Sequence, residues 1–133
     1  MAASRLGTTG VRFHEDERRS FYGDIFDTSE GDVNLVCLKH GKPIAWHRHQ
    51  RQDDRLFLVS GKLLVKTHLD MEQGTTTLMD HAWRGPLILR CGHWHGYQAL
   101  EPLTIVLQFN GPGKWDGTDE ERHPIDAEMP WIS

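Results

Sequence analysis

The stretch HRHQRQDDRLFLVSG at residues 47–61 decides the fold class, together with the shorter stretch GHWHG at residues 92–96. The first stretch opens with His47 and His49, and the second carries His95. In a β-strand, residues i and i+2 point to the same face, so His47 and His49 are expected to project together. His95, on a second strand, is expected to complete a histidine cluster in the mouth of a small β-barrel. Histidine titrates near neutral pH and is the commonest metal ligand, so the cluster indicates proton chemistry or metal binding.

The rest of the chain alternates short apolar runs with turns that contain glycine or proline. The runs are Val33 to Leu38, Arg55 to Val59, Leu63 to Leu69, Pro86 to Leu89 and Leu103 to Phe109. Several short strands separated by turn signals predict an all-β sandwich or barrel. Residues 118–123 are expected to form one helical turn capped by Thr118. The segment 111–133 is expected to lie as an ordered loop across the barrel.

Composition predicts one soluble, cytoplasmic domain that spans residues 1–133. With 38% hydrophobic and 26% charged residues, the chain has the balance of an ordinary globular protein. The net charge of −4 argues against a nucleic-acid partner, and no apolar run is long enough for a membrane span. No apolar segment typical of a secretory signal follows Met1. Cys37 and Cys91 are expected to be buried, reduced thiols, because no cysteine-rich framework surrounds them.

Two patterns in the chain resemble the signatures of the cupin superfamily. They are His47-x-His49-x4-Asp54-x6-Gly61, with aspartate where cupins usually carry glutamate, and Arg90-x-Gly92-x-x-His95, with arginine where they usually carry proline. The resemblance implies a single-domain, cupin-type jelly-roll β-barrel. Gly61 is expected to form the tight turn between two strands.

In metal-bearing cupins, the positions of His47, His49, Asp54 and His95 hold a divalent ion. Three imidazole nitrogens and one carboxylate suit Fe, Mn, Ni or Zn and leave coordination positions open for substrate. Two other interpretations remain open. The histidines could perform metal-free proton transfer, or they could only form hydrogen bonds inside a polar barrel.

A closer resemblance, to the dTDP-4-dehydrorhamnose 3,5-epimerases, covers most of the chain. These enzymes are metal-free cupins, so this resemblance implies no cofactor. The matching segments, in the same order along the chain, are residues 13–21, 60–70, 90–100 and 121–131. Within the first segment, Asp16-x-Arg18-Arg19-x-Phe21 is similar to the family's opening Asp-x-Arg-Gly-x-Phe.

This resemblance implies a histidine base that removes a proton next to a 4-keto group. His47 or His49 would be that base, and Asp54 or Asp53 would orient it. The guanidinium group pairs well with phosphate oxygens, which is the chemistry needed to hold the diphosphate of a nucleotide sugar. The residues expected to contact substrate are Arg18, Arg48, Arg55, Trp94 and Tyr97.

The family's proton-donating tyrosine follows the last long strand, but Leu103 to Trp115 contains no tyrosine. Only Tyr22 and Tyr97 occur in the chain. This departure favours a ketoisomerase or single epimerase in which His49 and His95 exchange a proton with the substrate. The resemblance also implies a homodimer in which an N-terminal arm, residues 1–30, is exchanged between the two chains.

Three functions remain open on this evidence. The first is an epimerase or isomerase of a nucleotide-linked 4-keto-6-deoxy sugar. The second is a metal-dependent cupin, such as a dioxygenase, lyase or isomerase of a small acid. The third is a non-enzymatic sugar-binding cupin.

Overall fold

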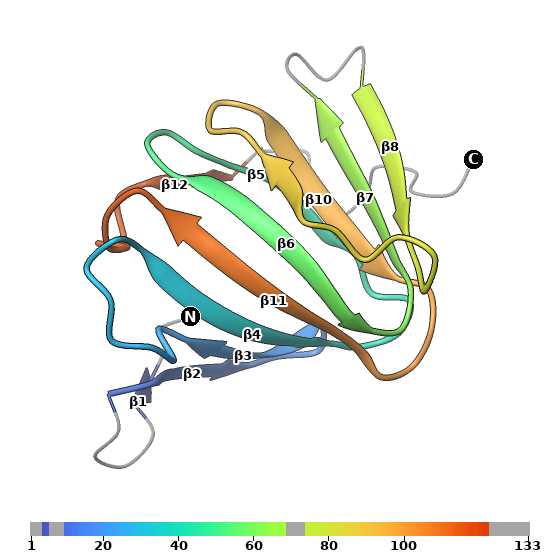
Figure 1. Ribbon diagram of the computed structural model, residues 1–133, viewed down its shortest axis with the longest axis horizontal. Helices are drawn as coiled ribbons and strands as arrows, with labels where there is room; N and C mark the ends of the chain where they lie inside the picture. Colours follow the sequence, from blue (N-terminus) through green and yellow to red (C-terminus); the bar gives the residue numbers. More distant parts are fainter. Residues whose placement is uncertain (1–3, 6–9, 69–73, 123–133) are drawn as a thin grey trace.

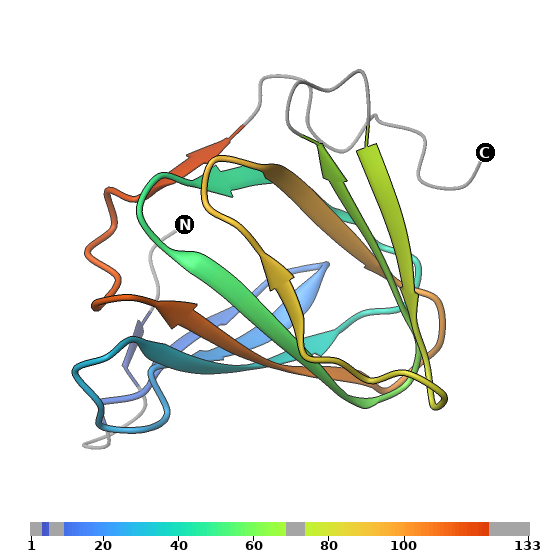
Figure 2. The ribbon, with the colours of Figure 1, turned by 45° about the horizontal axis from the view of Figure 1, so that its top comes forward.

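Alternation of inward and outward side chains builds two antiparallel β-sheets that face each other (Figures 1 and 2). The computed structural model describes residues 4–5, 10–68 and 74–122, and no helix occurs among them. No helix within these ranges is therefore long and apolar enough to cross a membrane. The predicted all-β class is confirmed.

The two sheets contain all of the strands in the described ranges. Sheet A has the order β1 (Ser4–Arg5), β2 (Arg12–Glu15), β3 (Arg19–Gly23), β4 (Asp32–Leu38), β11 (Thr104–Gly111), β6 (Asp53–Ser60) and β9 (Leu87–Leu89). Sheet B has the order β12 (Glu120–Arg122), β5 (Ile44–His49), β10 (Trp94–Ala99), β7 (Leu63–His68) and β8 (Gly74–Met79). The five runs predicted from the sequence correspond to β4, β6, β7, β9 and β11.

The inward faces of β6 and β11 change from apolar to polar along the barrel. Leu58 lies opposite Val106 in the apolar core, and Leu56 lies opposite Gln108. One step further, Asp54 lies opposite Asn110, and both side chains are buried. The hydrophobic core therefore fills one end of the barrel, and buried polar groups occupy the other.

Gly61 forms the tight turn between β6 and β7, as the sequence predicts. Its φ of 87° lies in the left-handed region, which glycine adopts without steric cost. A Cβ atom at this position would also collide with Thr104. Both observations require glycine here, where the chain passes from β6 of sheet A to β7 of sheet B.

The predicted helical turn at residues 118–123 is wrong. Glu120, Glu121 and Arg122 pair with β5 as a short edge strand, β12, with Glu120 opposite His49. The edge of β5 offers unpaired backbone groups, and pairing with them satisfies more hydrogen bonds than an isolated helical turn would. His123 lies outside the described residues.

The N-terminal arm extends sheet A of its own chain. Its β2–β3 hairpin pairs with β4, with Phe21 opposite Val36 (Figure 1). Exchange of this arm between two chains stays a prediction. The tail from Gly111 onward passes from β11 of sheet A to β12 of sheet B, and the rest of it lies outside the described residues.

Both cysteines are free, as predicted, but only one is shielded from solvent. Cys37 is partly buried on β4. Cys91 is exposed, in contrast to the prediction, because it lies in the turn before β10 rather than in a strand.

Two neighbouring residues on β6 test this packing. Leu58 is fully buried, whereas Val59 is 46% exposed on the outer face. Leu58→Ala is expected to lower the free energy of unfolding by about 2–5 kcal/mol, because it opens a cavity in the core. Val59→Ala is expected to stay within about 0.5 kcal/mol of the wild type. Urea denaturation of both variants checks this, and equal losses would contradict the assignment of the two faces.

Candidate metal centre

Four buried side chains from three strands converge at the polar end of the barrel. They are His47 and His49 on β5, Asp54 on β6 and His95 on β10. One donor atom from each lies within 4.8 Å of those of the others. The i, i+2 spacing on β5 turns both histidines inward, and antiparallel pairing places His95 opposite His47.

Asp54 joins the two sheets at this cluster. Its carboxylate is fully buried, with Oδ2 lying 3.1 Å from His95 Nε2 and Oδ1 lying 3.4 Å from His49 Nε2. The neighbouring Asp53 points elsewhere and accepts a hydrogen bond from the backbone N–H of Cys91. Of the two aspartates considered as the orienting carboxylate, the structure therefore places Asp54 at the histidines.

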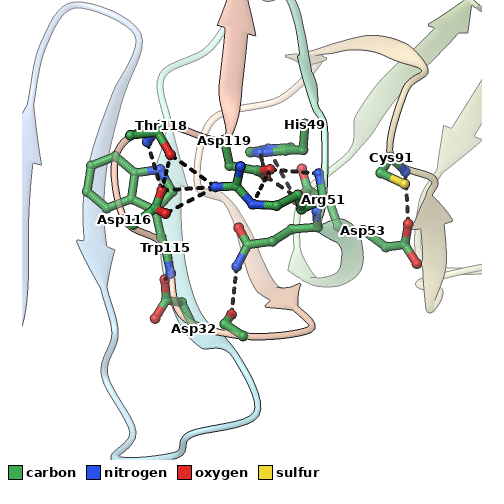
Figure 3. Close-up of polar contacts among 12 residues, drawn as sticks. Asp32, His49, Arg51, Asp53, Cys91, Trp115, Asp116, Thr118 and Asp119 are labelled. Atoms are coloured by element: carbon green, nitrogen blue, oxygen red, sulfur yellow. Dashed lines mark hydrogen bonds and ion pairs between the residues drawn. The ribbon is translucent and has the colours of Figure 1, made fainter.

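A second carboxylate, Asp119, holds the other side of the His49 ring (Figure 3). Its Oδ2 lies 3.1 Å from His49 Nδ1, and the side chain is buried. The backbone N–H groups of Arg51 and Gln52 donate to the same carboxylate. Asp119 was not predicted from the sequence, because only the return of the tail beside β5 brings it to His49.

The charges around His49 set its proton affinity. Burial alone would lower the pKa of this imidazole, but the neighbouring carboxylates, Asp54 above all, raise it to about 9. For Asp54, burial acts to raise the pKa of the carboxyl group, and the contacts with His49 and His95 outweigh it and hold that pKa below its usual range. Without a metal ion, the centre is therefore a buried imidazolium–carboxylate pair at neutral pH.

A chain of buried amides fixes the orientation of Asp54. Gln108 Nε2 donates to Asp54 Oδ2 at 3.4 Å, and Asn34 Nδ2 donates to Gln108 Oε1 at 3.2 Å. Asn34 Oδ1 in turn accepts the backbone N–H of Asp24 at 2.9 Å. Each amide uses one end as donor and the other as acceptor, so the carboxylate cannot rotate without breaking the chain of contacts.

The residues present fit a divalent transition metal. The donor set has three imidazoles and one carboxylate, which Mn, Fe, Ni and Zn accept. Asp54 Oδ1 and His95 Nε2 are buried and point into the cluster, where each has an ion-pair contact but no well-aligned hydrogen bond. Buried polar atoms normally form such a hydrogen bond, and a bound ion would satisfy both atoms. Asp119 behind His49 is the outer carboxylate that typically orients a histidine ligand.

A cavity of about 430 Å³ opens onto this cluster. Its volume lies within the range of small-molecule sites. His47, His49 and Tyr97 line it from sheet B, and Gln108 and Asn110 from β11. The remaining lining residues are Arg12, His14, Asp16, Arg18, Arg19 and Phe21 of the N-terminal hairpin, with Trp115 and Glu120 of the tail.

The structure brings two of the five predicted substrate contacts, Arg18 and Tyr97, to this cavity. Arg48, Arg55 and Trp94 do not line it. Arg48 binds Glu121 and stacks on Trp94, with its Cζ atom 4.4 Å from the ring centroid. Arg55 lies on the outer face of sheet A. Successive residues of a strand point to opposite faces, and this explains the position of both arginines. Each is adjacent in sequence to an inward-facing residue, so its own side chain points outward.

No protein-family model matches the sequence, and no curated protein matches it in sequence. Solved structures, in contrast, share its fold. The capsular polysaccharide assembling protein CapF from Staphylococcus aureus superposes with a TM-score of 0.74 at 18% identity, over 88% of this chain and 36% of CapF. Oxalate decarboxylase from Bacillus subtilis superposes with a TM-score of 0.71 at 13% identity, over 88% of this chain and 31% of the enzyme.

A third match is a conserved protein with a double-stranded β-helix domain from Klebsiella pneumoniae. Its TM-score is 0.64 at 18% identity, over 82% of both chains. The fold is therefore the double-stranded β-helix of the cupins, as the sequence predicts. This chain spans about a third of the length of CapF and of oxalate decarboxylase.

The raised pKa of His49 gives the metal-free protein a defined pH dependence. Unfolded, this imidazole loses its proton near pH 6.5, whereas folded it keeps the proton up to about pH 9. The stabilisation is complete below pH 6.5 and is lost as the pH rises towards 9. Urea denaturation in the presence of a chelator, between pH 6 and 9, is expected to show this fall. His49→Gln should remove this pH dependence. If the free energy of unfolding of that variant fell with pH as in the wild type, the raised pKa would not belong to His49.

The amide chain predicts a change in metal affinity without loss of any ligand. Gln108→Leu is expected to weaken metal binding by roughly 10–100-fold, because Asp54 loses its orienting contact. Gln98→Leu is the matched control, since Gln98 binds the carbonyl of Gly41 rather than the cluster. Competition with a chromophoric chelator measures both affinities. Equal affinities in the two variants would show that Gln108 does not position Asp54.

Proposed function

We propose that this protein is a metal-dependent enzyme that moves a proton on a small polar substrate, as an isomerase or lyase. The observation that carries the proposal is the convergence of His47, His49, Asp54 and His95 on one buried point beside a cavity. When bound, a divalent ion acts as a Lewis acid that polarises a substrate oxygen. The chain must then supply substrate orientation and a group that holds or gives a proton.

Tyr97 is the residue that we assign to proton donation. It lines the cavity on β10, and its ring centroid lies 6.3 Å from that of His47. Burial raises the pKa of its phenol, so the O–H group keeps its proton at neutral pH. The phenol is therefore held in the protonated form that can donate a hydrogen bond to a substrate atom that becomes negatively charged next to the metal centre, and the negative charge on that atom would draw the proton towards it.

The name of one structural neighbour supports a small acidic substrate. Oxalate decarboxylase acts on oxalate, a dicarboxylate, within the same fold. The similarity extends to the fold alone, so it supports the compatibility of this barrel with such chemistry rather than a shared reaction.

The second candidate is metal-free proton transfer on a nucleotide-linked 4-keto-6-deoxy sugar, as an epimerase or isomerase. The pair formed by His49 and Asp119 favours it, because a catalytic imidazole base needs an orienting carboxylate. The neighbour CapF assembles capsular polysaccharide, which supports a carbohydrate substrate.

Metal content distinguishes the two candidates. The protein as purified, and after reloading with Fe, Mn, Ni or Zn, is expected to hold about one ion per chain by plasma mass spectrometry. His47→Gln and His95→Gln should lose the ion, whereas His81→Gln, in an exposed turn, should keep it. A protein that stays metal-free under all of these conditions would overturn the metal-dependent function.

Deuterium exchange tests the second candidate directly. The protein is first freed of metal with a chelator and is then incubated in D2O with a dTDP-linked 4-keto-6-deoxy sugar. Exchange of hydrogen for deuterium at C3 or C5 of the sugar is followed by NMR. Exchange that disappears in both His49→Gln and Asp119→Asn would support the metal-free function. Absence of exchange in the wild type would reject it.

A further inference from the structure

Three arginines of the N-terminal hairpin line the cavity, and two of them have carboxylate partners. Arg12 lies 3.3 Å from Asp32, and Arg18 lies 2.9 Å from Asp16. The charges of Arg12 and Arg18 are therefore largely neutralised by the protein itself.

The third arginine, Arg19, has no carboxylate partner among residues 4–5, 10–68 and 74–122. Its Nε atom is buried and forms no hydrogen bond within those ranges. The guanidinium lies over the ring of Phe21, with its Cζ atom 5.1 Å from the centroid, and both side chains line the cavity. A guanidinium without an acceptor is costly in free energy, and because Nε is buried, the Nη groups are the part of Arg19 that can receive an acceptor from the cavity.

The charge balance of the cavity indicates the sign of that acceptor. Two carboxylates balance a divalent ion at the metal centre, because Asp54 belongs to the donor set and Asp119 lies 3.1 Å from His49. Arg19 places a positive charge on the hairpin side of the same cavity, where Glu120 is a further lining carboxylate. A metal ion with open coordination positions and a guanidinium, in one partly enclosed space, favour an anionic ligand that reaches from one to the other.

We propose that Arg19 is the carboxylate-binding residue of the site, so that the substrate is a small organic acid. Its carboxylate binds the guanidinium while the reacting end faces the metal centre. This inference rests on the proposed metal-dependent function. The sequence did not predict this role, because it indicated Arg18 rather than Arg19 as the substrate contact of this segment.

A carboxylate suits this position better than a phosphate. Two N–H donors of one guanidinium match the two oxygens of a carboxylate in a planar, bidentate pair, and the two Nη groups offer this arrangement without the buried Nε atom. Arg19 supplies one positive charge, which balances one carboxylate. A phosphate carries a greater negative charge, and the neighbouring Arg12 and Arg18 already bind aspartates.

Calorimetric titration with malonate, malonamide and inorganic phosphate tests the inference. The wild type, Arg19→Gln, Arg19→Lys and the control Arg90→Gln are compared in metal-free and metal-loaded form. Arg90 is the control because its side chain is 64% exposed and lies outside the cavity lining. Malonate is expected to bind Arg19→Gln at least tenfold more weakly than the wild type in both forms, because a charge-assisted pair is lost. Arg90→Gln should match the wild type.

Arg19→Lys separates charge from geometry. It keeps the positive charge but loses the planar fork, so its affinity for malonate is expected to lie between those of the wild type and Arg19→Gln. If Arg19→Gln fails to fold, as judged by its urea transition, the loss in Arg19→Lys decides the question. Equal malonate affinity in the wild type and the Arg19 variants would overturn the inference. Malonamide binding as tightly as malonate, or phosphate binding more tightly, would also overturn it.

The same titrations distinguish a failure of this inference from a failure of the proposed function. A protein that takes up no metal, but loses malonate binding in Arg19→Gln, would retain the carboxylate subsite and reject the metal-dependent function. A protein that binds one metal ion, but holds malonate equally well in all variants, would retain the metal centre and reject the role of Arg19.

Discussion

The buried carboxylate of Asp54 is the constraint on which the rest of this structure depends. An isolated charge inside a protein is so costly that it must be paired or neutralised. Asp54 is fully buried, and the groups that meet it come from both sheets: His49 and His95 from sheet B and Gln108 from sheet A. The carboxylate therefore requires that the two sheets close around it in one register.

This constraint explains why the barrel is polar at one end. Asn34, Gln108 and Asp119 are all buried, yet none of them lines the apolar core. Each is one or two contacts from Asp54: Gln108 touches it, Asn34 holds Gln108, and Asp119 holds the far side of His49. A half-satisfied polar network is costly, so one buried charge brings with it a set of further polar groups.

The sequence was sufficient to predict what depends on local geometry. Residues i and i+2 of a strand share a face, and glycine marks a tight turn, so the roles of His47, His49 and Gly61 could be predicted from spacing. The same rule places Arg48, between His47 and His49, and Arg55, next to Asp54, on the opposite faces of their strands. These arginines were predicted to bind substrate because a guanidinium pairs well with phosphate. Strand periodicity alone would have placed them away from the cavity.

Residues brought in by long-range contacts carried no such signal. Asp119 lies 70 positions from His49, and Gln108 lies 54 positions from Asp54. Their roles depend on the return of the tail beside β5 and on the register of β11 against β6. Arg19 is a third case, because its availability follows from the pairing of Arg12 and Arg18 with aspartates, which only the folded hairpin reveals.

The four-residue cluster also contains more than a single base would need. Proton transfer by His49 requires one imidazole and one orienting carboxylate, which His49 and Asp119 provide. Even if His95 exchanged the second proton, His47 would then be a buried polar group at a cost in desolvation without a chemical task. A divalent ion gives every member a role, since the three imidazoles and Asp54 become ligands and Asp119 becomes the carboxylate that orients His49. Proton and metal compete for the same nitrogen of His49, and the composition of the whole cluster favours the metal.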